Sequence, residues 1–178
     1  MTKSPRESPA QAAPRIVGTF LAEWIPGAQK ELELLVIGGE GPLKISLFDL
    51  QMETLIFGLH CLDRAVSAHF GDEYRTAFMN HAFGFACDAF ASTLPANLGD
   101  DFVERFDKHC RERHREYSAM TLLPAEGAGL KGELCWEFAK RICLSAGVDE
   151  PLVFKVMLED ANAILGMMIK VAQTLQSS

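Results

Sequence analysis

The fold is decided by residues 46–70, SLFDLQMETLIFGLHCLDRAVSAHF. Ser46 followed by Asp49 has the pattern of a capping box, in which the serine side chain accepts a hydrogen bond from the third residue of a helix. Beyond this start, apolar residues recur at alternating steps of four and three, at Phe48, Met52, Leu55, Leu59, Leu62 and Val66. This period is typical of one continuous apolar helix face. The stretch therefore predicts a helix roughly 37 Å long that ends before Gly71.

The segments that follow also have a helical period. Residues 73–93, which come after Gly71 and Asp72, are apolar on most sides, and this indicates a helix that is buried on most sides. Residues 100–119 carry a narrow apolar stripe on a densely charged background, which is typical of an outer, solvated helix. Further helices are expected at about 132–146 and 151–175, and residues 15–25 are expected to form a short amphipathic helix or a turn.

The last predicted helix has an unbroken heptad spacing. Its apolar positions are Phe154, Leu158, Ala161, Leu165, Met168, Ala172 and Leu175. Such a face packs against other helices at small angles, either in the core of the bundle or across a dimer.

These patterns predict an all-α fold, a helical bundle of five to seven helices around a long antiparallel hairpin formed by residues 46–70 and 73–93. Residues 28–37 favour a helix, but the alternation on either side of "GGEGP" also permits a short β-hairpin near residues 31–47. The Pro- and Ser-rich start predicts a disordered tail over residues 1–14, followed by a single helical domain over 15–178.

Composition and charge argue against several classes of protein. The formal net charge of −7 opposes binding to nucleic acid phosphates. Residues 76–99 are largely apolar, but their polar residues and Pro95 interrupt them too often for a membrane span. The five cysteines are odd in number and show no Cys-x-x-Cys spacing, which favours reduced core residues in a cytoplasmic protein.

The two central helices carry polar residues among apolar ones. In an antiparallel hairpin about Gly71, residues equidistant from the turn face each other. This places His60, Asp63 and His81 in one layer and Glu53 and Asp88 in a second, with Arg64 as a cap or an anchor to a neighbouring helix. His81 and Asp88 lie on the helix face of Tyr74, Phe78 and Phe85, so we expect them to be buried and His60 to be partly buried.

Three roles are open to these residues. Structural hydrogen bonding is the simplest, because a buried histidine or aspartate is costly unless it is paired. The alternatives are a small-ligand or proton-transfer site, or a metal ion bridging His60, Asp63 and His81. No motif names a cofactor. His109 and His114 are interpreted as surface histidines.

No catalytic motif is present, neither Gly-x-Ser-x-Gly nor His-Glu-x-x-His. The first functional expectation is therefore a non-enzymatic interaction module that binds a protein partner or forms a homodimer. The alternative is a small-ligand or metal-binding bundle with a polar site between the two central helices.

Overall fold

The computed structural model describes residues 7–24, 26–38, 44–92, 102–121 and 133–177. Within these ranges the chain forms seven helices and no strand, so the predicted all-α helical bundle is confirmed. The helices are α1 (Pro9–Trp24), α2 (Gly27–Gly38), α3 (Leu47–His69), α4 (Asp72–Ala91), α5 (Phe102–Ser118), α6 (Leu134–Ala146) and α7 (Pro151–Ser177).

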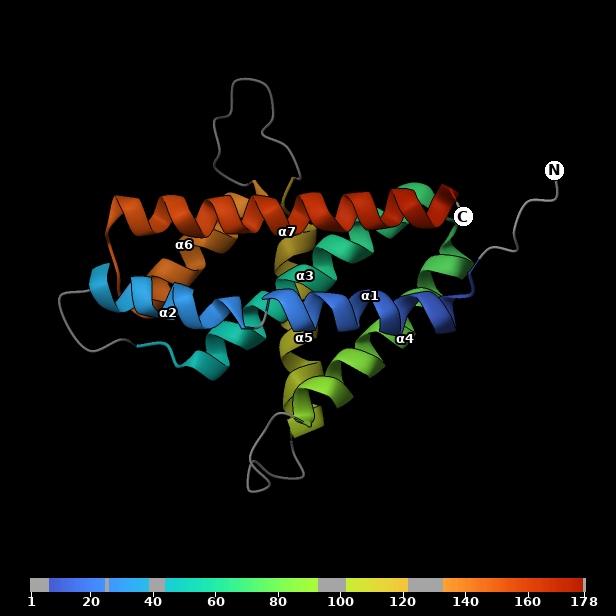
Figure 1. Cartoon of the computed structure of the whole chain (residues 1–178), viewed down its shortest axis with the longest axis horizontal. Coiled ribbons are helices and arrows are strands. Elements are labelled where there is room, and N and C mark those ends of the chain that lie inside the picture. The colour runs from blue at the N-terminus through green and yellow to red at the C-terminus, as the bar shows by residue number, and fades with distance from the viewer. Residues whose placement is uncertain (1–6, 25, 39–43, 93–101, 122–132, 178) are drawn as a thin grey trace.

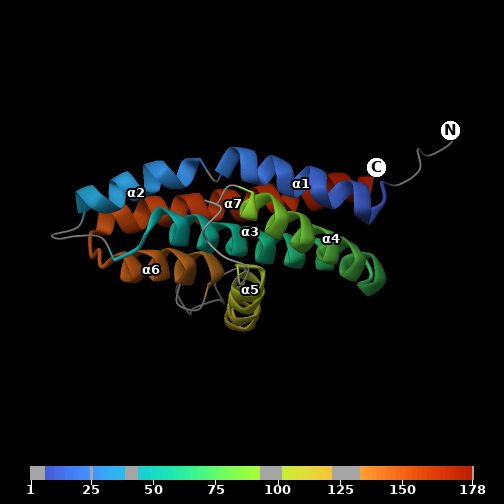
Figure 2. The same ribbon diagram turned by 90° about the horizontal axis from the view of Figure 1, so that it is seen from below.

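The helices are arranged in layers around α3. Figure 2 shows α1 and α2 on one face and α5 and α6 on the opposite face, with α3, α4 and α7 between them. In Figure 1, α7 runs along the length of the molecule beside α1 and α2, whereas α5 runs steeply across the other helices.

The central helix α3 begins as the sequence predicts. The Ser46 hydroxyl accepts a hydrogen bond from the Asp49 backbone N–H at 3.1 Å, and the Asp49 carboxylate accepts one from the Ser46 backbone N–H, which completes the capping box. All residues from 53 to 63 are buried. A helix that is buried on every side must also bury its polar residues, and these need partners from neighbouring helices.

The heptad face of α7 packs inside the chain. Five of its seven predicted positions are buried, while Phe154 and Leu158 are half-buried. The helix lies mainly against α3 and α6. Of the two arrangements that the sequence left open, the described residues therefore show packing in the bundle core.

The first helix begins earlier than expected. Residues 9–14, which were assigned to a disordered tail, belong to α1, and Ala12 and Ala13 are fully buried. Pro9 is compatible with this start, because a proline at the first helical position lacks only an N–H that has no partner within the helix. The prediction of disorder up to residue 14 was wrong for these residues, while residues 1–6 lie outside the described ranges.

The alternative of a β-hairpin near residues 31–47 does not hold where the structure can test it. Residues 27–38 form α2, as the helical interpretation predicted. Residues 39–43 lie outside the described ranges, and α3 starts at Leu47.

The buried face of α4 matches only in part the aromatic face that the sequence suggested. That face includes Phe78, Ala82 and Ala86, and the helix packs more extensively against α1 than against α3. Small alanines allow the close approach of α1, whereas Tyr74 and Phe85 are only half-buried. At about 100° per residue, His81 and Asp88 point away from this face.

His81 and Asp88 are both exposed. The expectation that they would be buried was therefore wrong.

Two further expectations, one about the cysteines and one about membrane spans, agree with the described structure. All five cysteines are buried free thiols, and burial raises the pKa of each. Among the described residues, no helix combines the length and apolar character needed to cross a bilayer.

The ring of Phe20 on α1 packs closely against Gly58 of α3. A Cβ atom at this position would clash with the ring of Phe20, which is 1% exposed. We expect Gly58→Ala to destabilise the fold by about 1–3 kcal/mol, because the buried ring must shift. Gly166→Ala in α7 is the matched control, since its Cβ would meet nothing within 4 Å. It should stabilise the helix by about 0.5–1 kcal/mol. Urea denaturation of both variants would test this, and equal effects would contradict it.

The contact between α2 and α7 includes two carboxyl groups. Burial and the neighbouring Asp160 raise the pKa of Glu31 to about 7, and the two side chains share a hydrogen bond. The folded chain therefore keeps a proton that the unfolded chain releases near pH 4.5.

This pair should make stability depend on pH. Between about pH 4.5 and 7 the folded state binds more protons at Glu31, so its contribution to the free energy of unfolding falls as pH rises. Glu31→Gln should remove this decrease in stability with rising pH. The stability of the variant relative to the wild type should therefore increase with pH. Melting temperatures at pH 5 and 8 would measure the difference. Glu112→Gln, at an exposed position of α5, should show no such trend.

Candidate functional site

Three polar residues of α3 are buried, and they contact side chains of two neighbouring helices. Glu53, His60 and Asp63 are 8%, 3% and 6% exposed. Glu53 and His60 meet side chains of α5, and Asp63 meets a side chain of α4. These buried polar residues therefore connect α3 to α4 and α5.

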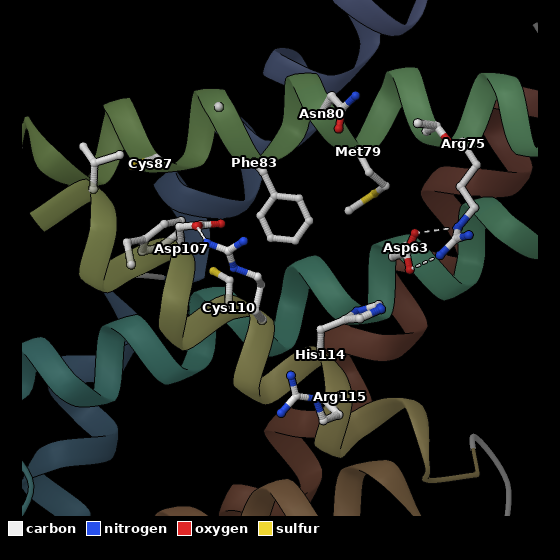
Figure 3. Close-up of a pocket in the computed structure, with 15 residues that line it drawn as sticks. Asp63, Arg75, Met79, Asn80, Phe83, Cys87, Asp107, Cys110, His114 and Arg115 are labelled. Carbon is white, nitrogen blue, oxygen red and sulfur yellow. Dashed lines mark hydrogen bonds and ion pairs between the residues drawn. The ribbon is translucent and has the colours of Figure 1, made fainter.

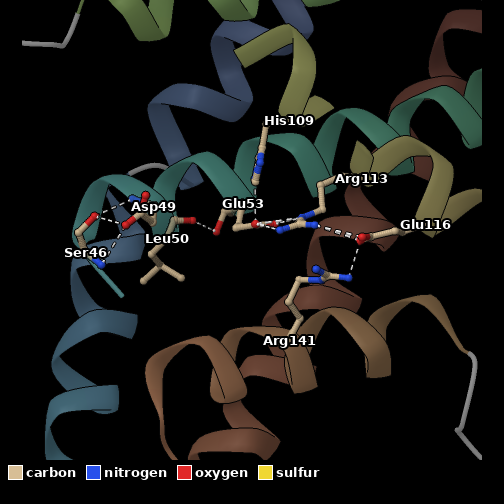
Figure 4. Close-up of polar contacts among 9 residues, drawn as sticks. Ser46, Asp49, Leu50, Glu53, His109, Arg113, Glu116 and Arg141 are labelled. Carbon is tan, nitrogen blue, oxygen red and sulfur yellow. Dashed lines mark hydrogen bonds and ion pairs between the residues drawn. The ribbon is translucent and has the colours of Figure 1, made fainter. Parts of the chain in front are cut away.

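Glu53 is the centre of a charged network (Figure 4). Arg113 of α5 donates to its two carboxylate oxygens at 2.7 and 2.9 Å, and His109 Nε2 lies 2.9 Å from Oε1. Burial alone would raise the pKa of Glu53, but the hydrogen bonds from His109 and Arg113 outweigh it and hold the pKa at about 2. Glu53 is therefore ionised at neutral pH and binds α5 through charge-assisted hydrogen bonds.

The network continues to α6. Arg113 also contacts Glu116 at 3.1 Å, and Glu116 accepts a hydrogen bond from Arg141 of α6 at 2.5 Å. The guanidinium of Arg141 lies 5.9 Å from the centre of the Tyr117 ring. One chain of alternating charges thus joins α3, α5 and α6.

Asp63 and Arg64 bind groups near two helix ends, the start of α4 and the end of α5. Arg75 in the first turns of α4 donates to both oxygens of Asp63, at 2.7 and 2.6 Å. Arg64 donates to the backbone oxygen of Met120 at 2.7 Å, just beyond the C-terminus of α5. A cation at this end satisfies carbonyl groups and complements the helix dipole. This contact is compatible with the cap or anchor to a neighbouring helix that the sequence suggested.

His60 faces His114, with their Nδ1 atoms 3.3 Å apart. The ring of Tyr117 lies on another side of His60, with centroids 5.4 Å apart. Burial lowers the pKa of His60 to about 4, with the neighbouring His114 as the next cause, so its imidazole is neutral at pH 7. Its Nε2 atom is buried and has no hydrogen-bond partner among the residues that the structure describes. This orphaned nitrogen is a cost that an apolar side chain at position 60 would avoid.

The structure separates the residues that were expected to share a site. His81 and Asp88 lie on the exposed side of α4, and the histidine that faces His60 is His114. The bridging metal site of His60, Asp63 and His81 is therefore not formed, since Asp63 binds Arg75 instead. Within the described ranges, no group of three or more His, Cys, Asp or Glu side chains is arranged to hold a metal ion.

Three residues of α5 were missed as partners: His109, Arg113 and His114. The apolar stripe of α5 consists of Phe102, Phe106, Cys110 and Tyr117. The stripe steps from 110 to 117 and skips positions 113 and 114, where the helix carries two residues that contact α3, Arg113 and His114. Charged or polar residues at that point of the stripe were the signal for partners on α3.

A cleft of about 830 Å³ opens between α4 and α5, with Asp63 of α3 at one end (Figure 3). Its apolar lining comes from Met79, Phe83, Cys87, Val103, Phe106 and Cys110. Polar lining residues include Arg75, Asp107, Arg111, His114 and Arg115. An open apolar cleft with a few convergent polar groups is the usual form of a small-molecule site.

The Glu53 network should dominate the stability of the α5 packing. Glu53→Gln removes one partner of a buried ion pair and should cost about 3–5 kcal/mol. Asp107→Asn breaks the exposed Asp107–Arg111 pair and should cost less than about 1 kcal/mol. Because the pKa of Glu53 is depressed, its contribution is present above pH 4.5 and is lost as pH falls toward about 2. Urea denaturation at pH 7 and pH 3 would measure both effects, and two variants of equal stability would contradict the assignment.

Comparison with known proteins gives no relative from which a function could be inferred. The chain matches no protein-family model, no curated protein and no solved structure. The functional conclusion therefore depends on the geometry of the cleft and of the residues behind it.

Proposed function

We propose that this chain binds a small organic molecule with an apolar body and an anionic group in the cleft between α4 and α5. The volume of about 830 Å³ falls within the range of about 300–1,000 Å³ that is typical of ligand sites. The observation that carries the proposal is that one cleft combines an apolar lining with more arginines than aspartates.

The apolar part of the lining suits a flat or extended hydrocarbon. Met79 and Phe83 extend from α4 into the cleft, and Cys110 lies across it on α5 (Figure 3). Phe83 is half-buried, so part of its ring is available for contact. Burial of such a surface against a ligand is favourable by about 25 cal/mol per Å².

The charged part of the lining favours an anion. Three arginines line the cleft, at positions 75, 111 and 115, against two aspartates, at positions 63 and 107. Asp63 neutralises Arg75, and Asp107 neutralises Arg111. Arg115 supplies the excess positive charge, in a chain whose formal net charge is −7. This local reversal of sign would attract an anionic ligand to the cleft.

The expectation of an interaction module stays a prediction. One of its bases was the heptad face of α7, and most of that face is buried against α3 and α6 of the same chain. This face therefore offers little surface for a homodimer. The cleft favours the alternative that the sequence also raised, a small-ligand bundle with Asp63 at its site.

Two fluorescent probes separate the apolar and anionic contributions. 1-Pyrenebutyrate carries a carboxylate, and 1-pyrenebutanol has the same ring system without a charge. Both should bind saturably, with the butyrate binding more tightly. Phe83→Ala should weaken both by about tenfold, because it removes apolar contact. Arg115→Glu should weaken the butyrate alone.

Lys108→Glu is the matched control for charge. Lys108 is an exposed residue of α5 outside the cleft lining, so this variant has the same net charge as Arg115→Glu. It should leave both affinities nearly unchanged. If neither probe saturates the wild type, or if Phe83→Ala has no effect, the proposal is wrong.

A further inference from the structure

One end of the cleft is formed by side chains of three helices. Asp63 of α3, Arg75 of α4 and His114 of α5 all line it, and Figure 3 shows them toward the same end. His60 contacts His114 without itself lining the cleft, and their Nδ1 atoms are 3.3 Å apart. An accessible imidazole thus has a buried imidazole as its partner.

The direction of this hydrogen bond follows from the surroundings of His60. One nitrogen must donate and the other must accept. If the neutral His60 accepted at Nδ1, its hydrogen would be on Nε2, a buried donor that has no acceptor within the described part of the chain. If His60 donates from Nδ1, its Nε2 is an unpaired acceptor. Among backbone groups, orphaned buried donors are rarer than under-satisfied acceptors, and the same reasoning favours His60 as the donor.

This direction determines the chemistry of His114. Its Nδ1 accepts from His60, so the hydrogen of the neutral ring is on Nε2. His114 therefore has an N–H donor left for a ligand in the cleft that it lines. Two of the five N–H groups of Arg75 bind Asp63, and the other three are not used by that pair.

We infer that His114, oriented by His60, recognises a carboxylate on the cleft ligand together with Arg75. The two oxygens of a carboxylate can accept from the imidazole and the guanidinium at the same time. His60 is a positioning residue, because it acts on the ligand only through His114. The inference rests on the proposed function and names the chemical group that this end of the cleft selects.

The orientation of His114 can be tested without a ligand. Nitrogen-15 NMR of the imidazole rings distinguishes the Nδ1–H and Nε2–H forms. We expect the Nε2–H form at His114 in the wild type and a mixture of forms in His60→Leu, which has no donor. His60→Gln should restore the Nε2–H form, because its amide can donate. A wild-type His114 in the Nδ1–H form, or a form unaffected by His60→Leu, would overturn the positioning role.

The recognition of a carboxylate is tested with the two pyrene probes. His114→Ala should weaken 1-pyrenebutyrate by about tenfold and leave 1-pyrenebutanol unchanged. His60→Leu should weaken the butyrate in the same sense, and His60→Gln should recover it. His81→Ala, at an exposed histidine outside the cleft lining, is the control and should change neither affinity.

The outcomes separate this inference from the proposed function. Saturable binding of both probes that responds to Phe83→Ala supports the cleft as a ligand site. If His114→Ala then leaves the ratio of the two affinities unchanged, the carboxylate is recognised elsewhere and the inference is overturned. If neither probe binds the wild type, the cleft is not a site for such ligands, and the inference falls with the proposed function.

Discussion

The bidentate contact between Arg113 and Glu53 is the interaction on which the rest of the site depends. It attaches α5, which runs steeply across the other helices, to the buried centre of α3. α5 forms one wall of the cleft and carries His114. The position of this wall therefore depends on a charged contact outside the cleft lining, because a shift of α5 would leave Glu53 buried without its partner.

The central helix obtains specificity from its polar residues. Glu53 and His60 pair with α5, Asp63 pairs with α4, and Arg64 binds the backbone just beyond the end of α5. Apolar contacts tolerate sliding of one helix along another, whereas each of these pairs has one geometry. Buried polar groups of this kind can fix the register between helices, as a single buried asparagine does in coiled coils.

The elements that the sequence predicted well depend on local chemistry. The capping box at Ser46 and the helical period of α3 act within a few residues of chain, and the structure reproduces both. The heptad face of α7 was also correct, because a long apolar stripe can be satisfied only by burial. The tail up to residue 14 was misjudged, since its prolines and serines resemble a linker although Ala12 and Ala13 are buried.

The sequence singled out polar residues of α3 but not their partners. Glu53, His60 and Asp63 are buried polar residues, and Arg64 is an anchor. The partners could not be assigned, because a hairpin in sequence does not determine which helix fills the space between its arms. α4 turned toward α1, and α5 took the place that the hairpin geometry gave to His81 and Asp88.

The contact of Phe20 with Gly58 has a consequence for how this sequence can change over generations. The ring on α1 occupies the volume that a side chain on α3 would need, so the two positions share one space. A larger residue at position 58 forces the Phe20 ring to shift, and a smaller residue at position 20 would relieve that clash, so the effects of substitutions at the two positions are expected to be coupled. Substitutions at these sites, 38 residues apart in the chain, are therefore expected to compensate each other, and either one alone draws on the surplus stability of the fold.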